Sequence, residues 1–233
     1  MSSWGDAHSG RGSRAGDFAR SDRSGRPGGF RRPVDDPPGT SRLFIAVPVS
    51  DDVRAAVGEL MARVAGASIE ERAPGQPRWV RVDGLHVTLR FLGPTLDERR
   101  PEVAAAVGAA ARGMAPFEIA LNGGGAFPDA HRPRVLWIGI GAGADELAGL
   151  ALRLNDELRS AGWPSEDRPL QGHLTLARTD GVVGADEYAQ RLMETAGDVR
   201  FTWQADRLVL YKSVVGHGPT RYEALAETPL GSS

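Results

Sequence analysis

The feature that most constrains the fold of this chain is a short pattern that occurs twice. The segments "LHVTLRFLG" at 85–93 and "GHLTLARTD" at 172–180 each hold a histidine and a threonine two positions apart, among apolar residues that favour strands. Because side chains alternate across a strand, positions i and i+2 share a face. Each strand is therefore predicted to have an apolar face in a core and a polar face. The polar members are His86, Thr88, His173 and Thr175.

The elements around these two strands also repeat in order, which indicates an internal duplication. Each half reads as strand, helix, loop, His-x-Thr strand, helix and strand, with the first repeat at about 42–127 and the second at about 134–213. Matched points lie 92 residues apart from Arg42 to Arg134 and 87 residues apart from His86 to His173. Two such lobes would pack about a pseudo-twofold axis, so we expect the two polar strand faces to meet at a shared cleft.

Local patterns place the individual elements. Apolar runs with β-branched residues predict strands at 42–49, 117–127, 134–141 and 201–213. Apolar stripes with a helical period predict helices at 50–65, 96–113, 144–162 and 185–197. A turn at Asp83–Gly84 is predicted to divide the segment 79–93 into two extended pieces.

Residues 1–40 differ in composition from the rest of the chain, because they are rich in Gly, Ser, Arg, Asp and Pro. They supply few apolar groups to offset the entropy of ordering, so we expect a disordered tail followed by one domain at 41–230. A solvated tail and an arm that contacts RNA both fit this composition.

The composition also limits the location and the partners of the protein. There is no cysteine, which excludes disulfides and thiolate metal sites. No apolar run is long enough to span a bilayer, so we expect no membrane partner. We also expect a cytoplasmic location and a monomer. The formal net charge is −2, whereas proteins that bind long nucleic acid are usually basic. Any nucleic acid is therefore expected to be bound at an end or a short segment.

Two histidines on facing strands suit acid–base chemistry near neutral pH. One imidazole can take a proton from a nucleophile while the other gives one to a leaving group, and the nearby threonine hydroxyls can stabilise developing charge. This arrangement fits the cleavage of a phosphodiester without a metal or another cofactor. The other histidines, at positions 8, 131 and 217, fall in the tail or in turn-rich segments, where we expect them on the surface.

The chain resembles the two-histidine (2H) phosphoesterase superfamily, and within it the RNA 2′,3′-cyclic phosphodiesterases, which are also called LigT-like or 2′-5′ RNA ligase proteins. The resemblance covers about residues 41–230. It rests on the strings "RLFIAVPV", "RWVRVDGLHVTLRFLG", "GAFPDAHRPRVLWIGI", "GHLTLAR" and "LVLYKS…RYEAL". It implies a bilobal α+β fold with two antiparallel sheets lining a central cleft and helices outside. It also implies hydrolysis of RNA 2′,3′-cyclic phosphate ends to 2′-phosphomonoesters.

The same resemblance implies a role for each site residue. His86 corresponds to the proton donor to the leaving 3′ oxygen, and His173 to the base that activates water. Thr88, Thr175 and Arg178 correspond to groups that hold the phosphate. Simple alternation puts Arg178 on the face opposite His173, so it reaches the site only if the strand ends or bulges there. By the same rule, Arg90 shares the face of His86.

Several alternatives stay open on the sequence alone. The fold could join or split 2′-5′ linkages, or act on another cyclic or 2′-5′ nucleotide such as ADP-ribose 1″,2″-cyclic phosphate or an oligoadenylate. It could instead be an RNA-end binding module without turnover, although the motifs of catalysis are intact. A metallohydrolase fits less well, because the chain has two candidate histidines where a catalytic zinc site usually needs three protein ligands.

Overall fold

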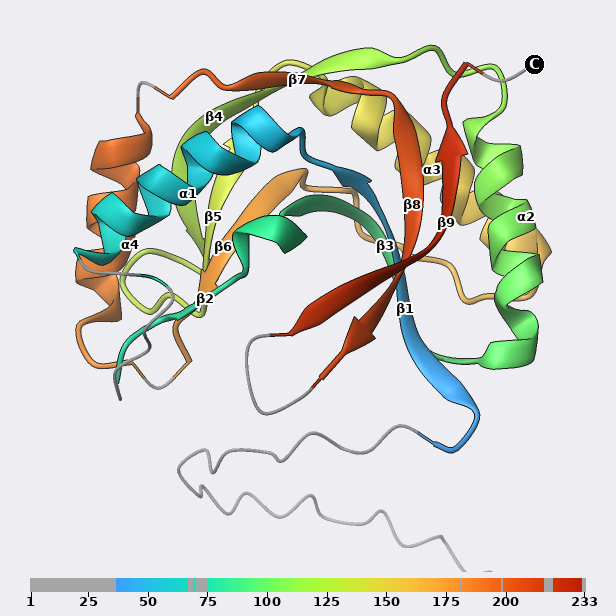
Figure 1. Cartoon of the computed structure of the whole chain (residues 1–233), viewed down its shortest axis with the longest axis horizontal. Helices are drawn as coiled ribbons and strands as arrows, with labels where there is room; N and C mark the ends of the chain where they lie inside the picture. The colour runs from blue at the N-terminus through green and yellow to red at the C-terminus, as the bar shows by residue number, and fades with distance from the viewer. Residues whose placement is uncertain are drawn as a thin grey trace, which may run out of the picture. The chain divides into compact units, whose positions relative to one another are not determined.

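The computed structural model describes residues 37–66, 69, 75–180, 182–197, 199–215 and 220–231. The expected tail lies outside these residues except at its last positions, and so do His8 and His217. Four of the described elements are helices of 12 residues or more, and the strands form an antiparallel sheet, as an α+β fold requires (Figure 1).

The strands of the described chain form one sheet in the order β7-β4-β5-β6-β3-β1-β8-β9, and β2 pairs with β6. Every pairing between neighbours is antiparallel. The sheet is continuous because β3 and β6 join its two groups of strands. The strands are β1 (Thr40–Pro48), β2 (Arg78–Trp79), β3 (His86–Leu96), β4 (Phe117–Phe127), β5 (Val135–Ile140), β6 (His173–Arg178), β7 (Thr202–Ala205), β8 (Arg207–Val214) and β9 (Arg221–Pro229).

The helices form where the apolar stripes predict them. They are α1 (Asp51–Ala65), α2 (Arg100–Ala111), α3 (Ala144–Ser160) and α4 (Ala185–Ala196). In α1 the buried residues are the predicted stripe, Val53, Val57, Leu60, Met61 and Val64. This helix ends at Gly66, whose φ of 68° is the left-handed conformation that glycine adopts without strain. Helix α1 contacts α4, and α2 contacts α3, on the outside of the sheet (Figure 1).

The sheet has one apolar and one mixed face, as the strand pattern predicts. In β1 the side chains of Leu43, Ile45 and Val47 belong to the core cluster that includes the buried residues of the helices. Phe44 is also buried, but it lies outside that cluster and packs against aromatic rings of neighbouring strands. The helices therefore cover one face of the sheet, and the other face carries polar and aromatic side chains.

Two predicted elements differ in detail, and one strand is not predicted. The expected strand at 201–213 is two strands, β7 beside β4 and β8 beside β1 and β9. The expected helix at 96–113 begins later, because β3 runs to Leu96 and a 3₁₀ turn, η2 (Asp97–Arg99), precedes α2. No local pattern in the sequence predicts β9. The turn at Asp83–Gly84 is confirmed as a 3₁₀ turn, η1 (Val82–Gly84).

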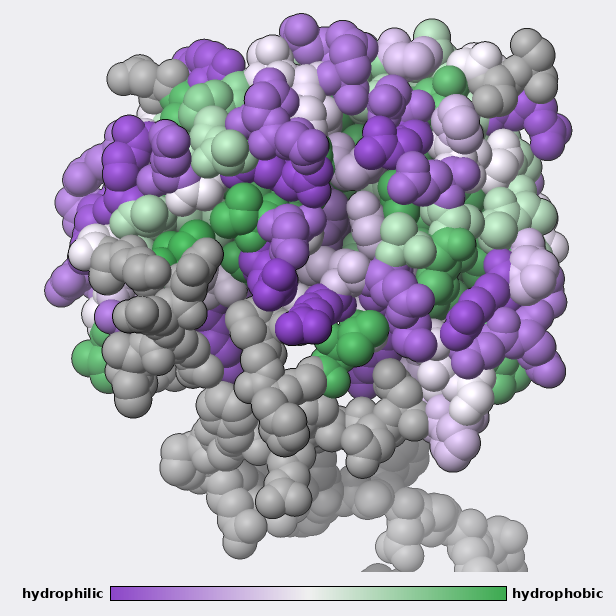
Figure 2. All heavy atoms as spheres, viewed as in Figure 1, coloured by the Kyte–Doolittle hydropathy of each residue, from purple (hydrophilic) through white to green (hydrophobic). Residues whose placement is uncertain are grey.

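The face drawn in Figure 2 is mainly hydrophilic, with hydrophobic residues in small patches between charged ones. Among the described residues, each helix is too short or too polar to pass through a bilayer.

Candidate active site

The two His-x-Thr strands lie side by side at the centre of the sheet. Val87 of β3 is paired with Leu174 of β6, and both side chains are buried in the core. In an antiparallel pair, the residues on either side of this point lie opposite each other on the other face. That register sets His86 beside Thr175, and Thr88 beside His173. The structure thus brings together the four polar residues that the sequence singles out.

Both imidazoles are held in the same way by the backbone. Nδ1 of His86 lies 2.7 Å from the carbonyl oxygen of Gly84, and Nδ1 of His173 lies 2.7 Å from that of Gln171. A carbonyl oxygen accepts only, so Nδ1 must carry the proton in both rings. In the neutral form Nε2 is then an acceptor, and in the charged form a donor. Each histidine therefore directs Nε2 away from the backbone carbonyl that anchors its ring.

Aromatic rings surround His86. Its ring centroid lies 4.8 Å from that of Phe44 and 4.9 Å from that of Tyr222, which meets it edge-on at 89°. The ring of Tyr211 lies at 5.8 Å. These rings fix the imidazole and withdraw it from water.

The surroundings of His173 are similar but more open. Phe127 of β4 meets the imidazole edge-on, with 5.0 Å between ring centroids, and Trp137 of β5 lies at 6.2 Å. Trp137 is paired with Thr175, so the indole lies on the same face as the site.

Burial lowers the pKa of both histidines below the ordinary value. The pKa of His86 falls from 6.5 to about 4, mainly by burial, partly offset by the hydrogen bond to Gly84 and further lowered by the charge of His173. The pKa of His173 is also lowered, again mainly by burial. The charge of His173 affects the pKa of His86 because the two imidazoles lie close together at the site. At pH 7 the free protein holds both rings neutral.

A bulge in β6 brings Arg178 to the site. Leu136 lies opposite Ala177, but Trp137 lies opposite Thr175, so Leu176 is an extra residue in the strand. Alternation resumes beyond it, and Arg178 shares the face of Thr175 instead of the opposite one. Arg178 is exposed, and its charge lowers the pKa of Tyr222 against the effect of burial. The charge of the guanidinium therefore acts on a ring that packs against His86.

A matching bulge in β3 turns Arg90 away, which corrects the expectation from alternation. Ile45 lies opposite Arg90, but Ala46 lies opposite Thr88, so Leu89 is the extra residue. Arg90 is 8% exposed, donates a hydrogen bond to the carbonyl oxygen of Pro164 and lies 3.4 Å from a carboxylate oxygen of Glu166. It anchors the loop before β6 and does not face the histidines.

Phe91 also lies on the face of the histidines, although no pattern in the sequence singled it out. It occupies in β3 the position after the bulge that Arg178 occupies in β6, and it lies opposite Phe44 on the face of Thr88. Its side chain is 67% exposed, while its ring lies 5.8 Å from that of Phe44. The sequence signal that could have identified it is a large aromatic residue in the same strand as His86 and Thr88. The other missed residues are Phe44, Phe127, Trp137, Tyr211 and Tyr222.

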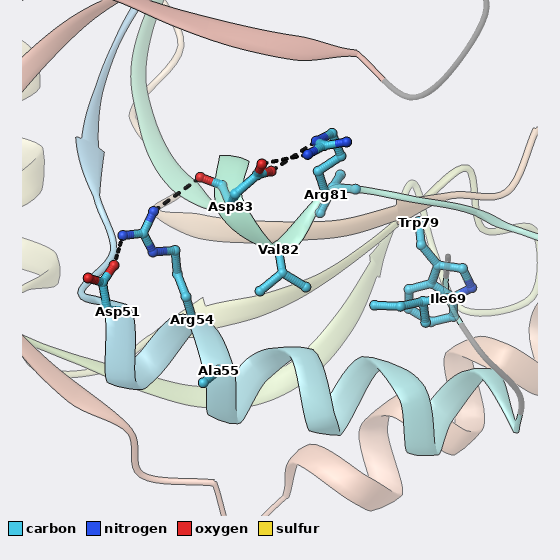
Figure 3. Close-up of a pocket in the computed structure, with 9 residues that line it drawn as sticks. Asp51, Arg54, Ala55, Ile69, Trp79, Arg81, Val82 and Asp83 are labelled. Carbon is cyan, nitrogen blue, oxygen red and sulfur yellow. Dashed lines mark hydrogen bonds and ion pairs between the residues drawn. The ribbon is translucent and has the colours of Figure 1, made fainter. Parts of the chain in front are cut away.

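The turn that anchors His86 is itself braced from α1 (Figure 3). Arg54 forms an ion pair with Asp51 and donates a hydrogen bond of 3.1 Å to the backbone oxygen of Asp83. Arg81 binds the carboxylate of Asp83 through two nitrogens, at 2.6 and 3.0 Å. These contacts fix η1, whose last residue, Gly84, accepts the hydrogen bond from His86.

The third described histidine, His131, is exposed in a turn whose backbone is held by Asp129, as expected. Within the described part of the chain, no three or more histidine, aspartate or glutamate side chains gather where they could hold a metal ion.

Comparison with known proteins gives the class to which the fold and site belong. The sequence model of the 2′-5′ RNA ligase superfamily matches residues 49–217, which is most of the chain. The protein belongs to this superfamily, as the resemblance implies.

Several curated relatives bear the name RNA 2′,3′-cyclic phosphodiesterase. The relative from Aeropyrum pernix is 34% identical over 157 residues, which are 66% of this chain and 86% of that protein. The relative from Geobacillus stearothermophilus is 31% identical over 193 residues, 82% of this chain, but the match spans 57% of that longer protein. The relative from Thermotoga maritima is 28% identical over 80% of this chain and 94% of its own length.

Solved structures show the same fold. The crystal structure of TT0787 from Thermus thermophilus is 28% identical in sequence, superimposes with a TM-score of 0.65, and is matched over 97% of its length and 81% of this chain. LigT of E. coli, in a crystal structure with 3′-AMP, is 24% identical, with a TM-score of 0.62 over 83% of this chain and 99% of its own.

Proposed function

We propose that this protein hydrolyses RNA 2′,3′-cyclic phosphodiesters to 2′-phosphomonoesters, with His86 and His173 as acid and base. The observation that carries the proposal is the equal anchoring of two imidazoles on adjacent strands, each with Nδ1 on a backbone carbonyl. Two free Nε2 atoms at one site fit an in-line displacement, which needs a base and an acid on opposite sides of phosphorus. The names of the relatives supply the substrate class.

The reaction can be written with these groups. Nε2 of neutral His173 takes a proton from water as the water oxygen bonds to phosphorus. The bond from phosphorus to the 3′ oxygen breaks, and Nε2–H of charged His86 protonates that oxygen. The phosphate stays on the 2′ oxygen, and the protein ends with the proton on His173 in place of His86. Exchange with solvent then restores the starting state.

Thr88, Thr175 and Arg178 are the groups proposed to hold the phosphate. The register puts one threonine next to each histidine, where a hydroxyl can donate to a non-bridging oxygen that gains charge. Arg178 adds a positive charge on the same face, which the bulge in β6 makes possible.

The aromatic surface favours a nucleotide over a simple phosphodiester. Phe91 is exposed on the face that carries the histidines, and every nucleobase has a π-face that can stack on such a ring. RNA ends and small cyclic nucleotides both present this base next to the phosphate.

With its pKa lowered to about 4, His86 is neutral in the free protein at pH 7, so at this pH the acid acquires its proton when the substrate binds. An anionic phosphodiester beside the ring favours the charged form and raises the pKa from about 4. Burial among aromatic rings strengthens this attraction, because the local dielectric is low. Binding of the phosphate thus favours protonation of His86.

Ligation through a 2′-5′ bond is a second candidate, because the superfamily that matches the chain carries that name. It uses the same groups, with a 5′ hydroxyl of a second RNA in place of water. Ligation and hydrolysis can be distinguished by incubating RNA that ends in a cyclic phosphate with RNA that carries a 5′ hydroxyl. Only ligation gives a joined product.

We also infer that the two lobes arose by duplication and line a central cleft. In support, the sheet order is symmetrical about the β3–β6 pair, and both strands begin at a histidine and bulge at the same distance from it. The last strand of each proposed repeat pairs with the first strand of the other repeat, since β4 lies beside β5 and β8 lies beside β1. The monomeric state, the cytoplasmic location and the disordered tail stay predictions.

The deciding experiment is an assay of the four nucleoside 2′,3′-cyclic phosphates, with and without an attached RNA chain. We expect hydrolysis of both kinds of substrate, undiminished by a strong chelator. Binding of RNA ends without turnover would instead favour a binding module, and loss of activity in the chelator would favour a metallohydrolase.

A further inference from the structure

We propose that the pocket beside η1 and the start of β9 binds a phosphate on the 5′ side of the terminal nucleotide. The enzyme would then favour ends of RNA chains over mononucleotides. This inference rests on the proposed hydrolysis of cyclic phosphates and adds a second phosphate subsite to it.

The pocket adjoins the site of His86. It has a volume of about 420 Å³ and is lined by Arg81, Asp83, Gly84, Thr220, Arg221 and Tyr222. Two of these residues touch the site directly, because Gly84 accepts the hydrogen bond from His86 and the ring of Tyr222 lies 4.9 Å from the imidazole. A ligand bound by His86 could therefore extend into this pocket.

Gly84 and the ring of Tyr222, which separate the pocket from His86, pack closely against each other. A Cβ atom at Gly84 would lie 2.9 Å from the ring of Tyr222, so only glycine lets this ring pack on the turn. Tyr222 thus has two neighbours, the imidazole of His86 and the backbone of η1. Burial raises the pKa of its phenol, which stays a neutral hydrogen-bond donor at pH 7.

The lining of the pocket suits an anion. The lining includes two arginines, Arg81 and Arg221, but a single carboxylate, and the hydroxyls of Thr220 and Tyr222 add donors. Arg81 is held by Asp83 at 2.6 Å, which fixes its position. Arg221 is exposed, and the described residues form no ion pair with it. A phosphodiester has the negative charge and the oxygen acceptors that such groups bind.

The chemistry of the substrate identifies this anion. The cyclic phosphate uses the 2′ and 3′ oxygens of the terminal ribose, so an RNA chain can leave only through the 5′ oxygen, and its first charged group is the 5′ phosphate. An overall charge of −2 makes a long electrostatic track along RNA unfavourable, whereas a single local subsite is compatible with it.

The test compares 2′,3′-cyclic AMP with the same nucleotide carrying a 5′ phosphate and with the dinucleotide ApA ending in a cyclic phosphate. For the wild type we expect kcat/KM to be about tenfold higher on the two substrates with the extra phosphate, as for one charge-assisted contact. Arg221→Ala should remove this preference and leave kcat/KM on 2′,3′-cyclic AMP within about twofold. Arg221→Lys should restore part of it.

Arg159→Ala is the matched control, because Arg159 is an exposed arginine on α3 paired only with Asp156 of its own helix within the described chain. It should keep the wild-type preference. A wild type that hydrolyses all three substrates equally, or an Arg221→Ala variant that keeps the preference at an unchanged melting temperature, would overturn the subsite.

A binding measurement separates this inference from the proposed reaction. Calorimetry should show that the wild type, but not Arg221→Ala, binds adenosine 2′,5′-bisphosphate about tenfold more tightly than 2′-AMP. If this difference in affinity is found but 2′,3′-cyclic AMP is not hydrolysed, the proposed reaction is refuted and the phosphate subsite is supported. Equal affinities with normal turnover would refute the subsite alone.

Discussion

Val87 lies directly opposite Leu174 where β3 meets β6, with both side chains buried beneath the sheet. This apolar pair fixes the register of the two strands, because a slip of one residue would move every side chain to the other face. The histidines and threonines on either side of it are thereby held on the face away from the helices. The core thus determines the geometry of the proposed site.

Replacement of either His86 or His173 by alanine should lower kcat/KM for 2′,3′-cyclic AMP by about 10²–10⁴-fold, because each is proposed to move one proton. His131→Ala is the control, since this histidine is exposed in a turn and should leave the rate unchanged. Steady-state kinetics and circular dichroism of the three variants check this. A folded His173→Ala variant with nearly wild-type kcat would rule out the two-histidine mechanism.

The lowered pKa values predict an acidic optimum for kcat/KM, which reports on the free enzyme. The productive form has one neutral and one charged imidazole. Below the lower pKa both rings are charged, and above the higher one both are neutral, so the rate falls on both sides. With His86 at about 4 and His173 below 6.5, the maximum should lie below pH 6.5.

The profile of kcat should peak at a higher pH than that of kcat/KM, because bound phosphate favours the charged imidazoles. The limbs belong to the coupled pair and not to one named ring. Rates between pH 4 and pH 9, with NMR titration of the histidines, measure both effects. An increase of kcat/KM through pH 7 to 9 would contradict a charged acid.

The opposite directions of Arg178 and Arg90 predict opposite phenotypes. Arg178→Ala should lower kcat/KM by about 10- to 100-fold with little change in stability, because a charged contact to the phosphate is lost. Arg90→Ala should keep most of the kcat but lower the free energy of unfolding by about 1–3 kcal/mol, since it leaves the Pro164 carbonyl without its donor. Kinetics and urea denaturation distinguish the two; a catalytic loss in Arg90→Ala alone would reverse the assignment.

Removal of residues 1–36 should leave the melting temperature and the turnover of cyclic AMP unchanged, because their composition gives them no core to join. Removal of residues 1–40 should lower the melting temperature. It deletes the first residue of β1, Thr40, and the Gly39 oxygen that accepts a 2.8 Å hydrogen bond from Asp97. Thermal unfolding of both truncations tests this boundary; equal melting temperatures would place it later in the chain.

The polar face of the site could be predicted because it depends on local alternation. His86, Thr88, His173 and Thr175 each lie before the bulge of their strand, where the period of two still holds. Arg90 could not be predicted in this way, because its direction depends on one extra residue that appears only when β3 pairs with β1. Arg178 was expected to reach the site only if β6 ended or bulged before it. The pairing of β6 with β5 contains this bulge.

Other parts of the fold leave weak traces in the sequence. β9, with the sequence "RYEALAETP", is an edge strand with many exposed positions, so it lacks a clear apolar alternation. The segment around Asp206 reads as one continuous strand, yet the chain there passes from β7, beside β4, to β8, beside β1. Phe44, Tyr211 and Tyr222 come from three strands, so only the folded sheet gathers them around His86.

The central claim is that His86 protonates the 3′ oxygen while His173 activates water on the opposite side of phosphorus. Phosphorus NMR of the product formed from 2′,3′-cyclic AMP tests it most directly, because the 2′ and 3′ monophosphates give separate signals. We predict that the wild type forms 2′-AMP almost exclusively and that the His86→Ala and His173→Ala variants form neither product at a comparable rate. A predominantly 3′-AMP product would contradict the assigned orientation of the two histidines.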